Sequence, residues 1–176
     1  MTKLSLLLKM LENETSQTTT QATMFSAGER ILPDLDANIK WGNSLIGSDF
    51  YSGKQMAMFD DEEMYKVKAF DWDSRSSGFG AIMAEGGFDA VIGNPPYVRQ
   101  ETLGKEFKGY AKQKYETYAG TADLYAYFIE KGVKLLNENG LYGVIVANKW
   151  MRANYGKSLR KWMLQRQIIE ITDFKD

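Results

Sequence analysis

The residues of this chain best suited to chemistry are Asn94, Pro95, Pro96 and Tyr97, which directly follow a short apolar run. Proline restricts its own backbone and that of the residue before it, so these four residues predict a stiff loop. Such a loop can present two acceptors together, the Asn94 side-chain oxygen and the Pro95 main-chain oxygen. Two acceptors that hold both hydrogens of an aromatic amino group would turn its delocalised lone pair towards an electrophile without a general base. The Tyr97 ring offers a surface on which such a base could stack.

The composition excludes several other kinds of chemistry. The chain contains no cysteine and no histidine. Disulfides, thiolate zinc sites, cysteine nucleophiles and Ser-His-Asp chemistry are therefore excluded, and the commonest metal ligand is absent. We expect no metal site, and an active loop that needs no general base suits this composition.

The elements around the loop predict where it lies in a fold. The run Phe88 to Gly93 stops at two prolines, as a buried parallel strand does when it enters a loop. Ligands of doubly wound sheets bind outside the carboxyl ends of the strands, so residues 94 to 97 fall where a substrate would lie. The alternative is that they only form a turn that ends the strand, because Asn and Pro are common turn residues.

Four further elements follow in an alternating order. We expect a helix that Thr121 caps and Gly140 ends, and its inward face is formed by Leu124, Phe128, Leu135 and Leu136. A second buried strand is expected over Leu141 to Ala147, and a third over Gln167 to Thr172. Between them Asn154 to Gln165 reads as a helix whose inward residues are Leu159, Trp162 and Met163. Strand, helix, strand, helix, strand predicts an α/β fold with a parallel sheet.

The first half of the chain is less regular. We predict a helix over Leu4 to Leu11, a strand over Asn38 to Ile46 and a short helix around Asp61 to Lys68. The run Leu4 to Leu11 is far shorter than the roughly 20 apolar residues that span a bilayer. We therefore expect neither a membrane span nor a signal peptide, and a cytoplasmic protein.

Charge is distributed unevenly along the chain although the net charge is only −1. Residues 1 to 98 carry 14 acidic and 8 basic side chains, whereas residues 99 to 176 carry 9 acidic and 14 basic ones. No acidic residue lies between Asn148 and Gln167, where the basic residues are Lys149, Arg152, Lys157, Arg160, Lys161 and Arg166. This run could neutralise phosphates, or it could be an ordinary solvated helix face.

The block from Gly87 to Glu101 closely resembles the amino-methyltransferase motif of type IIG restriction-modification enzymes and related BREX-type adenine methyltransferases. The resemblance covers nearly the whole chain and implies site-specific transfer of methyl from S-adenosylmethionine to the N6 atom of a flipped adenine in double-stranded DNA. It assigns the catalytic role to Asn94, Pro95, Pro96 and Tyr97.

The same resemblance implies further site residues. The segment from Ile39 to Ile46 resembles the end of the family's third strand, so Asn43 and Ser44, with Asn94, are expected to bind the cofactor; a plain Gly-Asn turn at Asn43 is the alternative. DNA contacts are expected from Arg99, Lys149 and Arg152, since two of these follow the carboxyl end of a strand. Trp150 lies between them, and its side chain could face either the DNA or ordinary solvent.

Residues 121 to 125 resemble the family's helix start before the fifth strand and are expected to be mostly scaffold. We expect Asp123 to serve the first helical turn, where its charge suits the helix dipole. Tyr125, Tyr127 and Phe128 are expected in the core, because their spacing fits a packed helix.

As a fold, the resemblance implies an incomplete Rossmann-like methyltransferase domain over residues 1 to 176, with a mostly parallel sheet flanked by helices. The family's first two strands, last strand and target-recognition domain have no counterpart in this sequence, so the rest of a parent polypeptide is an expected partner. Asn38 to Ile46 would then leave the sheet, pair with another copy through an open sheet edge, or be poorly ordered. We expect little methyl transfer and weak cofactor affinity from these residues alone.

Two other functions stay open at this point. Protein glutamine-N5 methyltransferases also use an Asn-Pro-Pro-Tyr motif, because a side-chain amide presents a similar planar amino group. The chain could also be a non-catalytic fragment that keeps a DNA-binding or interaction surface. The basic, aromatic-rich stretch after Tyr97 and the wider resemblance favour DNA methylation.

Overall fold

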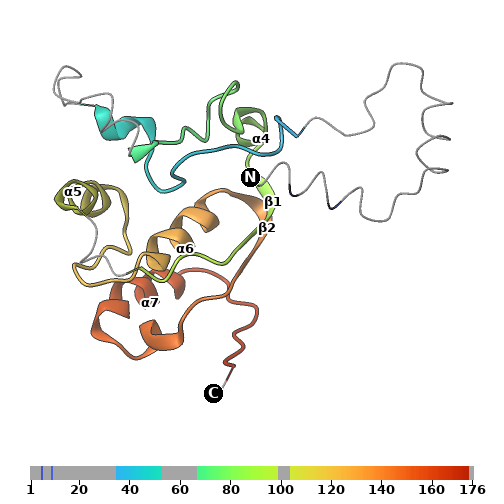
Figure 1. Cartoon of the computed structure of the whole chain (residues 1–176). Coiled ribbons are helices and arrows are strands. Elements are labelled where there is room, and N and C mark those ends of the chain that lie inside the picture. Colours follow the sequence, from blue (N-terminus) through green and yellow to red (C-terminus); the bar gives the residue numbers. More distant parts are fainter. Residues whose placement is uncertain (1–4, 6–8, 10–34, 53–66, 99–103, 175–176) are drawn as a thin grey trace, which may run out of the picture. The chain divides into compact units, whose positions relative to one another are not determined.

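The computed structural model describes residues 5, 9, 35–52, 67–98 and 104–174, and the chain divides into two compact units, Met1–Trp41 and Gly42–Asp176 (Figure 1). In the first unit Ser5 and Lys9 are helical, as predicted, and the rest of Leu4 to Leu11 lies outside the described residues. Asn38 lies in a turn, with its amide 3.1 Å from the Leu35 carbonyl oxygen. The helix predicted around Asp61 falls almost entirely outside the described residues.

The second unit contains a two-stranded parallel sheet. Strand β1, Phe88–Gly93, has the predicted bounds, and strand β2 runs from Leu136 to Val144. The two strands pair in parallel, with Ala90 opposite Leu141 and Gly93 opposite Val144. The predicted second strand was therefore right in direction and partner but wrong at both ends. A register shift between Phe88 and Ala90 accommodates the extra residues at the start of β2.

Helix α6, Tyr125–Lys134, is the helix expected between the two strands, but its predicted ends were wrong. Thr121 is exposed, and no side chain caps the helix; its first turn is instead held by the Leu124 amide, which donates to the Val98 carbonyl at 2.8 Å. The helix ends before Gly140 because the Leu135 carbonyl accepts the Phe88 amide at 2.9 Å, which commits the chain to the sheet. Gly140 is needed for another reason, since a Cβ there would lie 2.7 Å from the Phe88 oxygen.

The core of this unit is built mainly from α6 and its neighbours. Tyr125 and Tyr127 are fully buried, as predicted, and Phe128 is partly buried against the same cluster. Strand β2 contributes Tyr142 and Val144 in alternate positions, because successive strand side chains point to opposite faces, and Val146 after the strand packs against the same cluster. Trp150 is 7% exposed and belongs to this core, so it does not face DNA or solvent.

After β2 the chain forms two 3-10 turns, η4 (Asn148–Met151) and η5 (Asn154–Gly156), and then helix α7, Lys157–Met163. The inward residues were predicted correctly, since Leu159 and Trp162 are buried and Met163 packs against the core. The strand predicted over Gln167 to Thr172 is wrong: within the described residues this segment pairs with no strand and is exposed. Its apolar pattern suits a strand, but β2 offers it no hydrogen bonds.

Among its described residues the unit also contains η1 (Ser48–Tyr51), α4 (Gly80–Ala84) and α5 (Lys105–Lys114). The predicted strand at Asn38 to Ile46 is absent from the β1-β2 sheet and keeps only one parallel bridge, between Asn43 and Ala69. This agrees with the expectation that the segment leaves the sheet. Among the described residues, no helix is both long and apolar enough to cross a bilayer.

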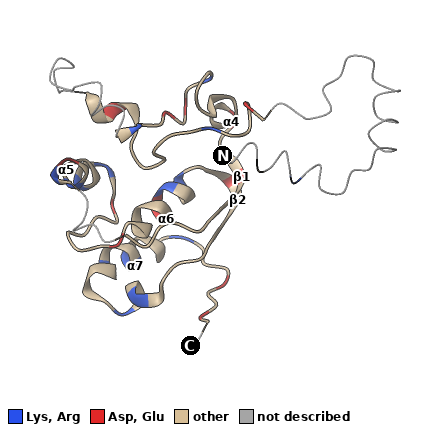
Figure 2. Cartoon of the chain, viewed as in Figure 1, with Lys and Arg blue, Asp and Glu red and all other residues tan. Residues whose placement is uncertain are grey.

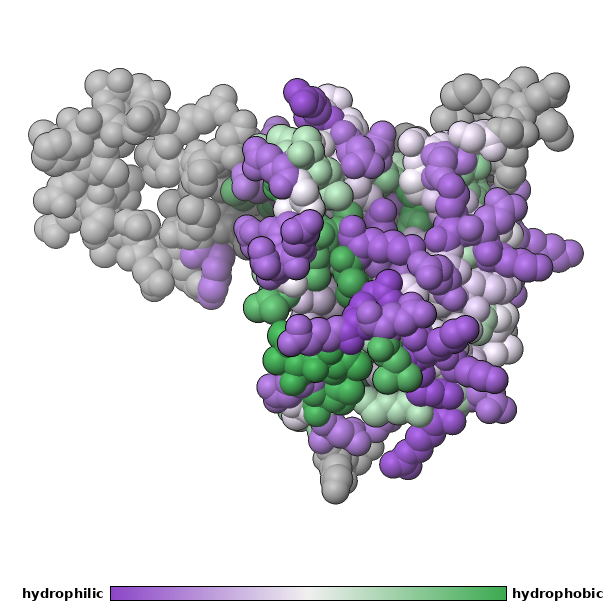
Figure 3. All heavy atoms as spheres, turned by 180° about the vertical axis from the view of Figure 1, so that it is seen from behind, coloured by the Kyte–Doolittle hydropathy of each residue, from purple (hydrophilic) through white to green (hydrophobic). Residues whose placement is uncertain are grey.

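One face of the sheet carries exposed apolar side chains. Ile92 of β1 is 85% exposed and Leu141 of β2 is 59% exposed, so the prediction that both strands are buried was wrong for this face. Figure 3 shows apolar residues gathered on the side of the molecule opposite to the view of Figure 1. Only the face towards α6 is covered by the packing described above.

Candidate active site

The loop Asn94–Val98 begins where β1 ends. The Gly93 carbonyl accepts the Ile145 amide at 3.2 Å, which is the last hydrogen bond between the two strands at this edge. Pro95 is buried, whereas Asn94 and Pro96 are exposed. Because the strands are parallel, their carboxyl ends lie at one edge, and the Asn94 loop shares that edge with the segment after β2.

Two acceptors of this loop are available. Among the described residues, the Asn94 side chain and the Pro95 carbonyl oxygen form no hydrogen bond with the protein. The buried Pro95 ring anchors the loop, so its exposed neighbour is held on a fixed backbone. The loop therefore differs from a turn whose polar groups are satisfied within the protein.

Tyr97 lies beside these acceptors with 55% of its surface exposed. Its hydroxyl donates to the Ile145 carbonyl at 3.3 Å, and its ring centroid lies 6.3 Å from that of Tyr125 at an interplanar angle of 63°. The Val98 carbonyl next to it accepts the Leu124 amide. The ring is thus held at its tip and its edge while much of it faces solvent.

A hydrogen-bonded group of side chains lies behind Tyr97. The Tyr155 hydroxyl donates to the Asp123 carboxylate at 2.9 Å, and the Tyr155 and Tyr125 hydroxyls are 3.0 Å apart. Burial, followed by the hydrogen bond with Tyr155, raises the pKa of Tyr125 above its ordinary value. Asp123 precedes the helix N-cap Leu124, and α6 has no acidic residue in its first turn, so the role expected for Asp123 in that turn was wrong. Sequence reasoning missed Tyr155, because it lies 30 residues from Tyr125 and no local spacing links the two.

The segment after β2 presents basic side chains at the same edge. Lys149 and Arg152 are exposed, while Arg160 is turned inwards and donates to the carbonyls of Trp150 and Ala153. These bonds fix the two 3-10 turns on α7. Figure 2 shows Lys and Arg positions, in blue, on and around α7.

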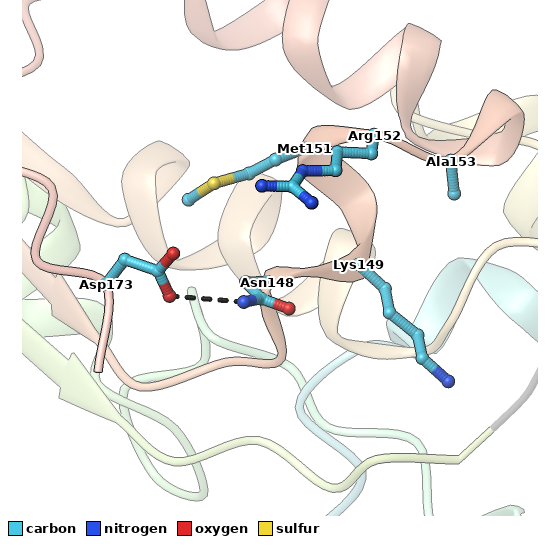
Figure 4. A pocket seen from close by; sticks show the side chains of 6 residues that line it. All are labelled: Asn148, Lys149, Met151, Arg152, Ala153 and Asp173. Carbon is cyan, nitrogen blue, oxygen red and sulfur yellow. Dashed lines mark hydrogen bonds between the residues drawn. The ribbon is translucent and has the colours of Figure 1, made fainter. Parts of the chain in front are cut away.

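A hollow of about 470 Å³ opens in this segment, lined by Asn148, Lys149, Met151, Arg152, Ala153 and Asp173 (Figure 4). The Asn148 side-chain amide donates to the Asp173 carboxylate at 3.1 Å, and Figure 4 shows the Lys149 side chain pointing away from that pair. Lys149 is exposed and lines the hollow at a distance from this pair. Arg99, the third residue expected to contact DNA, lies outside the described residues.

The predicted cofactor residues Asn43 and Ser44 lie in another part of the unit. The Asn43 side-chain oxygen accepts the Leu45 amide at 3.1 Å, and the Ser44 carbonyl accepts the Trp72 indole N–H at 3.1 Å. The described hydrogen bonds and ring contacts do not join them to the Asn94 loop. The Gly-Asn turn is therefore present at Asn43. The Asn43 backbone amide donates to the Lys68 carbonyl at 2.6 Å, whereas the Asn43 side-chain nitrogen Nδ2 and the Ser44 hydroxyl form no hydrogen bond among the described residues.

A second hollow, of about 370 Å³, lies near η1 and α5 and includes Asp49, Tyr110 and Lys114. Burial alone would raise the pKa of the Asp49 carboxyl, but hydrogen bonds from Lys114 and from Tyr110, at 2.8 Å, outweigh it and lower the pKa. Burial also raises the pKa of Tyr110 to about 12. Tyr110 in turn accepts the Gly47 amide, so this cluster joins α5 to the segment before η1.

Comparisons with known proteins give a consistent result. The family model described as Eco57I restriction-modification methylase matches residues 1–176. The type II restriction enzyme and methyltransferase RM.Eco57I of Escherichia coli is 33% identical over 93% of this chain. The type II methyltransferase M.BstVI of Geobacillus stearothermophilus is 43% identical over 43% of the chain, and the adenine-specific methyltransferase BrxX of Escherichia coli O9:H4 is 31% identical over 46% of it.

The matched relatives are much longer than this chain. The match spans 14% of the length of RM.Eco57I, 14% of M.BstVI and 6% of BrxX. The similarity to RM.Eco57I covers nearly all of the chain, whereas the similarity to the other two covers less than half of it.

Proposed function

Since the chain belongs to the Eco57I restriction-modification methylase family, we propose that it carries the target-base site of a DNA adenine-N6 methyltransferase. The observation that supports this most directly is the pair of unpartnered acceptors, the Asn94 side-chain oxygen and the Pro95 carbonyl oxygen, beside the half-exposed Tyr97 ring. Similarity to a relative named as an adenine-specific methyltransferase favours adenine over cytosine.

The chemistry follows from what the two acceptors can hold. An adenine amino group is a poor nucleophile because its lone pair is delocalised into the ring. When Asn94 and Pro95 each accept one of its hydrogens, the nitrogen is drawn towards tetrahedral geometry and the lone pair turns out of the ring plane. The nitrogen loses a proton to solvent as the new bond forms, so the chain needs no general base.

Stacking on Tyr97 would hold the extruded base in the same place. Extrusion from a duplex costs a few kcal/mol, and base–aromatic stacking returns roughly 1 to 3 kcal/mol. The exposed part of the ring is available for this contact, and its hydroxyl is already held by the Ile145 carbonyl. Tyr97 therefore offsets part of the extrusion cost without moving.

S-adenosylmethionine, when bound, would supply the electrophilic methyl group, whose bond to sulfur breaks as the bond to the adenine nitrogen forms, so that a neutral thioether leaves. The residues present fit part of this group: the Asn43 side-chain nitrogen Nδ2 and the Ser44 hydroxyl are donors without a partner among the described residues. The Asn94 side chain is proposed to contribute at the other end. A Rossmann-like arrangement of the larger polypeptide would bring these residues together.

The basic edge after β2 is proposed to meet the DNA backbone. Lys149 and Arg152 are exposed at the edge that also carries Asn94, so a duplex whose base enters the site would lie against them. Each phosphate contact adds about one to the slope of log affinity against log salt. Replacing both residues with Ala should weaken DNA binding and lower that slope by about two.

The test uses a full-length polypeptide that contains these residues, labelled S-adenosylmethionine and duplex DNA. Asn94→Ala removes one of the two acceptors and should lower kcat by roughly 10²- to 10³-fold, as the loss of one preorganised transition-state contact does elsewhere. Asn139→Ala is the matched control, because Asn139 is an exposed asparagine near the start of β2, at the opposite end of the strand.

Nuclease digestion and mass analysis of the labelled product decide the target. N6-methyladenine in the wild-type reaction supports the proposal. Methylation of cytosine, labelling of a glutamine peptide in place of DNA, or full kcat in Asn94→Ala would overturn it.

A further inference from the structure

The hydrogen-bonded side chains behind Tyr97, those of Asp123, Tyr125 and Tyr155, join three parts of the chain. Asp123 and Tyr125 lie at the start of α6, Tyr155 lies in η5, and Tyr97 lies in the loop after β1. Tyr125 is completely buried, so its ring is the fixed member against which the more exposed Tyr97 ring rests. The position of Tyr97 therefore depends on residues 26 to 58 positions further along the chain.

The direction of the hydrogen bonds follows from Asp123. The Tyr155 hydroxyl donates its single proton to the Asp123 carboxylate, at 2.9 Å. The Tyr155 oxygen can then accept in its 3.0 Å contact with the Tyr125 hydroxyl, which also has a hydrogen bond with Asp123. Asp123 and Tyr155 together therefore hold the tip of the buried Tyr125 ring.

The Tyr125 ring acts on Tyr97 through a ring contact. The centroids lie 6.3 Å apart at 63°, an edge-to-face geometry that aromatic pairs favour by about 0.5–1.5 kcal/mol. Among the described residues, this loop is also held by the buried Pro95 ring, by the Tyr97 hydroxyl on the Ile145 carbonyl and by the Leu124 amide on the Val98 carbonyl. These contacts locate the loop, but none of them sets the rotation of the Tyr97 ring plane.

We propose that Asp123 and Tyr155 are positioning residues that, by orienting the buried Tyr125 ring, set the plane of the Tyr97 ring on which the target base stacks. The stacking part rests on the proposed function, whereas the orientation of Tyr97 does not. Neither residue touches the base. Their effect is therefore expected on kcat more than on the KM for DNA.

The first experiment reads Tyr97 directly and needs no DNA. The chain is labelled with 3-fluorotyrosine, and the fluorine resonance that disappears in Tyr97→Phe is assigned to Tyr97. Tyr155→Phe removes only the hydroxyl and should shift or broaden that resonance. The matched control is Tyr118→Phe, because the Tyr118 ring stacks in the core at 6.5 Å from Tyr127 and its hydroxyl has no hydrogen-bond partner among the described residues.

A second pair of variants tests whether Tyr155 needs only an acceptor oxygen at position 123 or also the negative charge of Asp123. Asp123→Asn keeps an acceptor oxygen for Tyr155 and should leave the Tyr97 resonance close to that of the wild type. Asp123→Leu removes the acceptor and should change the resonance as Tyr155→Phe does. An unchanged Tyr97 resonance in both Tyr155→Phe and Asp123→Leu would overturn the proposal.

The full-length polypeptide provides the functional readout. Tyr155→Phe should lower kcat for methyl transfer roughly ten- to a hundredfold, since small misplacements of a reacting group have effects of this size, with little change in KM. If Tyr155→Phe leaves kcat unaltered while Asn94→Ala lowers it, the positioning role is refuted and the proposed function stands. If no form methylates adenine, the proposed function fails, and the fluorine resonance still decides whether Asp123 and Tyr155 orient Tyr97.

Discussion

Glu130 of α6 is a buried carboxylate whose removal should strongly destabilise the fold. Its side chain is 0% exposed and accepts the Thr117 amide at 2.8 Å and the Glu116 amide at 3.1 Å, while Lys134 donates to it at 2.6 Å. These bonds anchor the turn between α5 and α6 to the helix. We predict that Glu130→Ala releases this turn from the core.

The expected loss follows from the groups left without a partner. Thr117 is fully buried, so its unpaired amide costs about 1–3 kcal/mol. The half-exposed Lys134 can return to water, and the Glu116 amide is only partly buried, so each adds less. Together with the cavity that the deleted, fully buried side chain leaves, the sum is about 3–5 kcal/mol.

Urea denaturation followed by circular dichroism measures this loss. With a slope of about 2 kcal/mol per molar urea, the midpoint should fall by about 2 M. Glu116→Ala is the matched control: its carboxylate is 62% exposed and lies 3.4 Å from Lys134, so its loss should cost less than about 1 kcal/mol. Equal midpoints for Glu130→Ala and Glu116→Ala would show that the buried bonds do not anchor the turn.

Two further predictions concern packing and pH. Gly132→Ala would place a methyl group against the Tyr142 ring where α6 packs on β2, and it should lower the free energy of unfolding by about 1–3 kcal/mol, measured by heat or urea. Gly109→Ala is the control: it has open space around it in α5, so it should be neutral or stabilising. The pKa of Asp49 is lower in the fold than its ordinary 3.8, so its ionised form stabilises the fold above pH 3.8, and that contribution is lost as pH falls through the lower folded-state pKa. Asp49→Asn should therefore flatten the stability-against-pH curve below pH 3.8, and an unchanged curve would contradict the role assigned to Lys114.

Local sequence patterns predicted much of the framework. The apolar run Phe88 to Gly93 and the two prolines after it located β1 and its loop, because a buried strand and a proline stop are properties of neighbouring residues. Helical spacing identified the inward residues of α7 for the same reason. For α6 it identified Tyr125 and Tyr127, whereas the expected Leu124 and Phe128 are only partly buried and Leu136 lies in β2. The alternation of elements predicted the parallel pairing of β1 and β2.

Other predictions failed because they depend on partners far away in the chain. The apolar pattern of Gln167 to Thr172 suits a strand, yet a strand exists only where another backbone pairs with it, and within the described residues none does. The end of α6 is set by a hydrogen bond to the Leu135 carbonyl from the Phe88 amide, 47 residues earlier in the chain. Turn signals at Gly140 cannot report such a bond.

The candidate site likewise has features that local sequence predicts and features that only the tertiary structure shows. The residue types at Asn94 to Tyr97 determined which chemistry is available, because acceptor oxygens and proline stiffness belong to the residues themselves. Only the tertiary structure decided that Asn94 is exposed without a partner, and that Tyr97 rests on a buried tyrosine held by Tyr155 and Asp123. Contacts between separate segments depend on how the whole unit packs, and no local spacing encodes that.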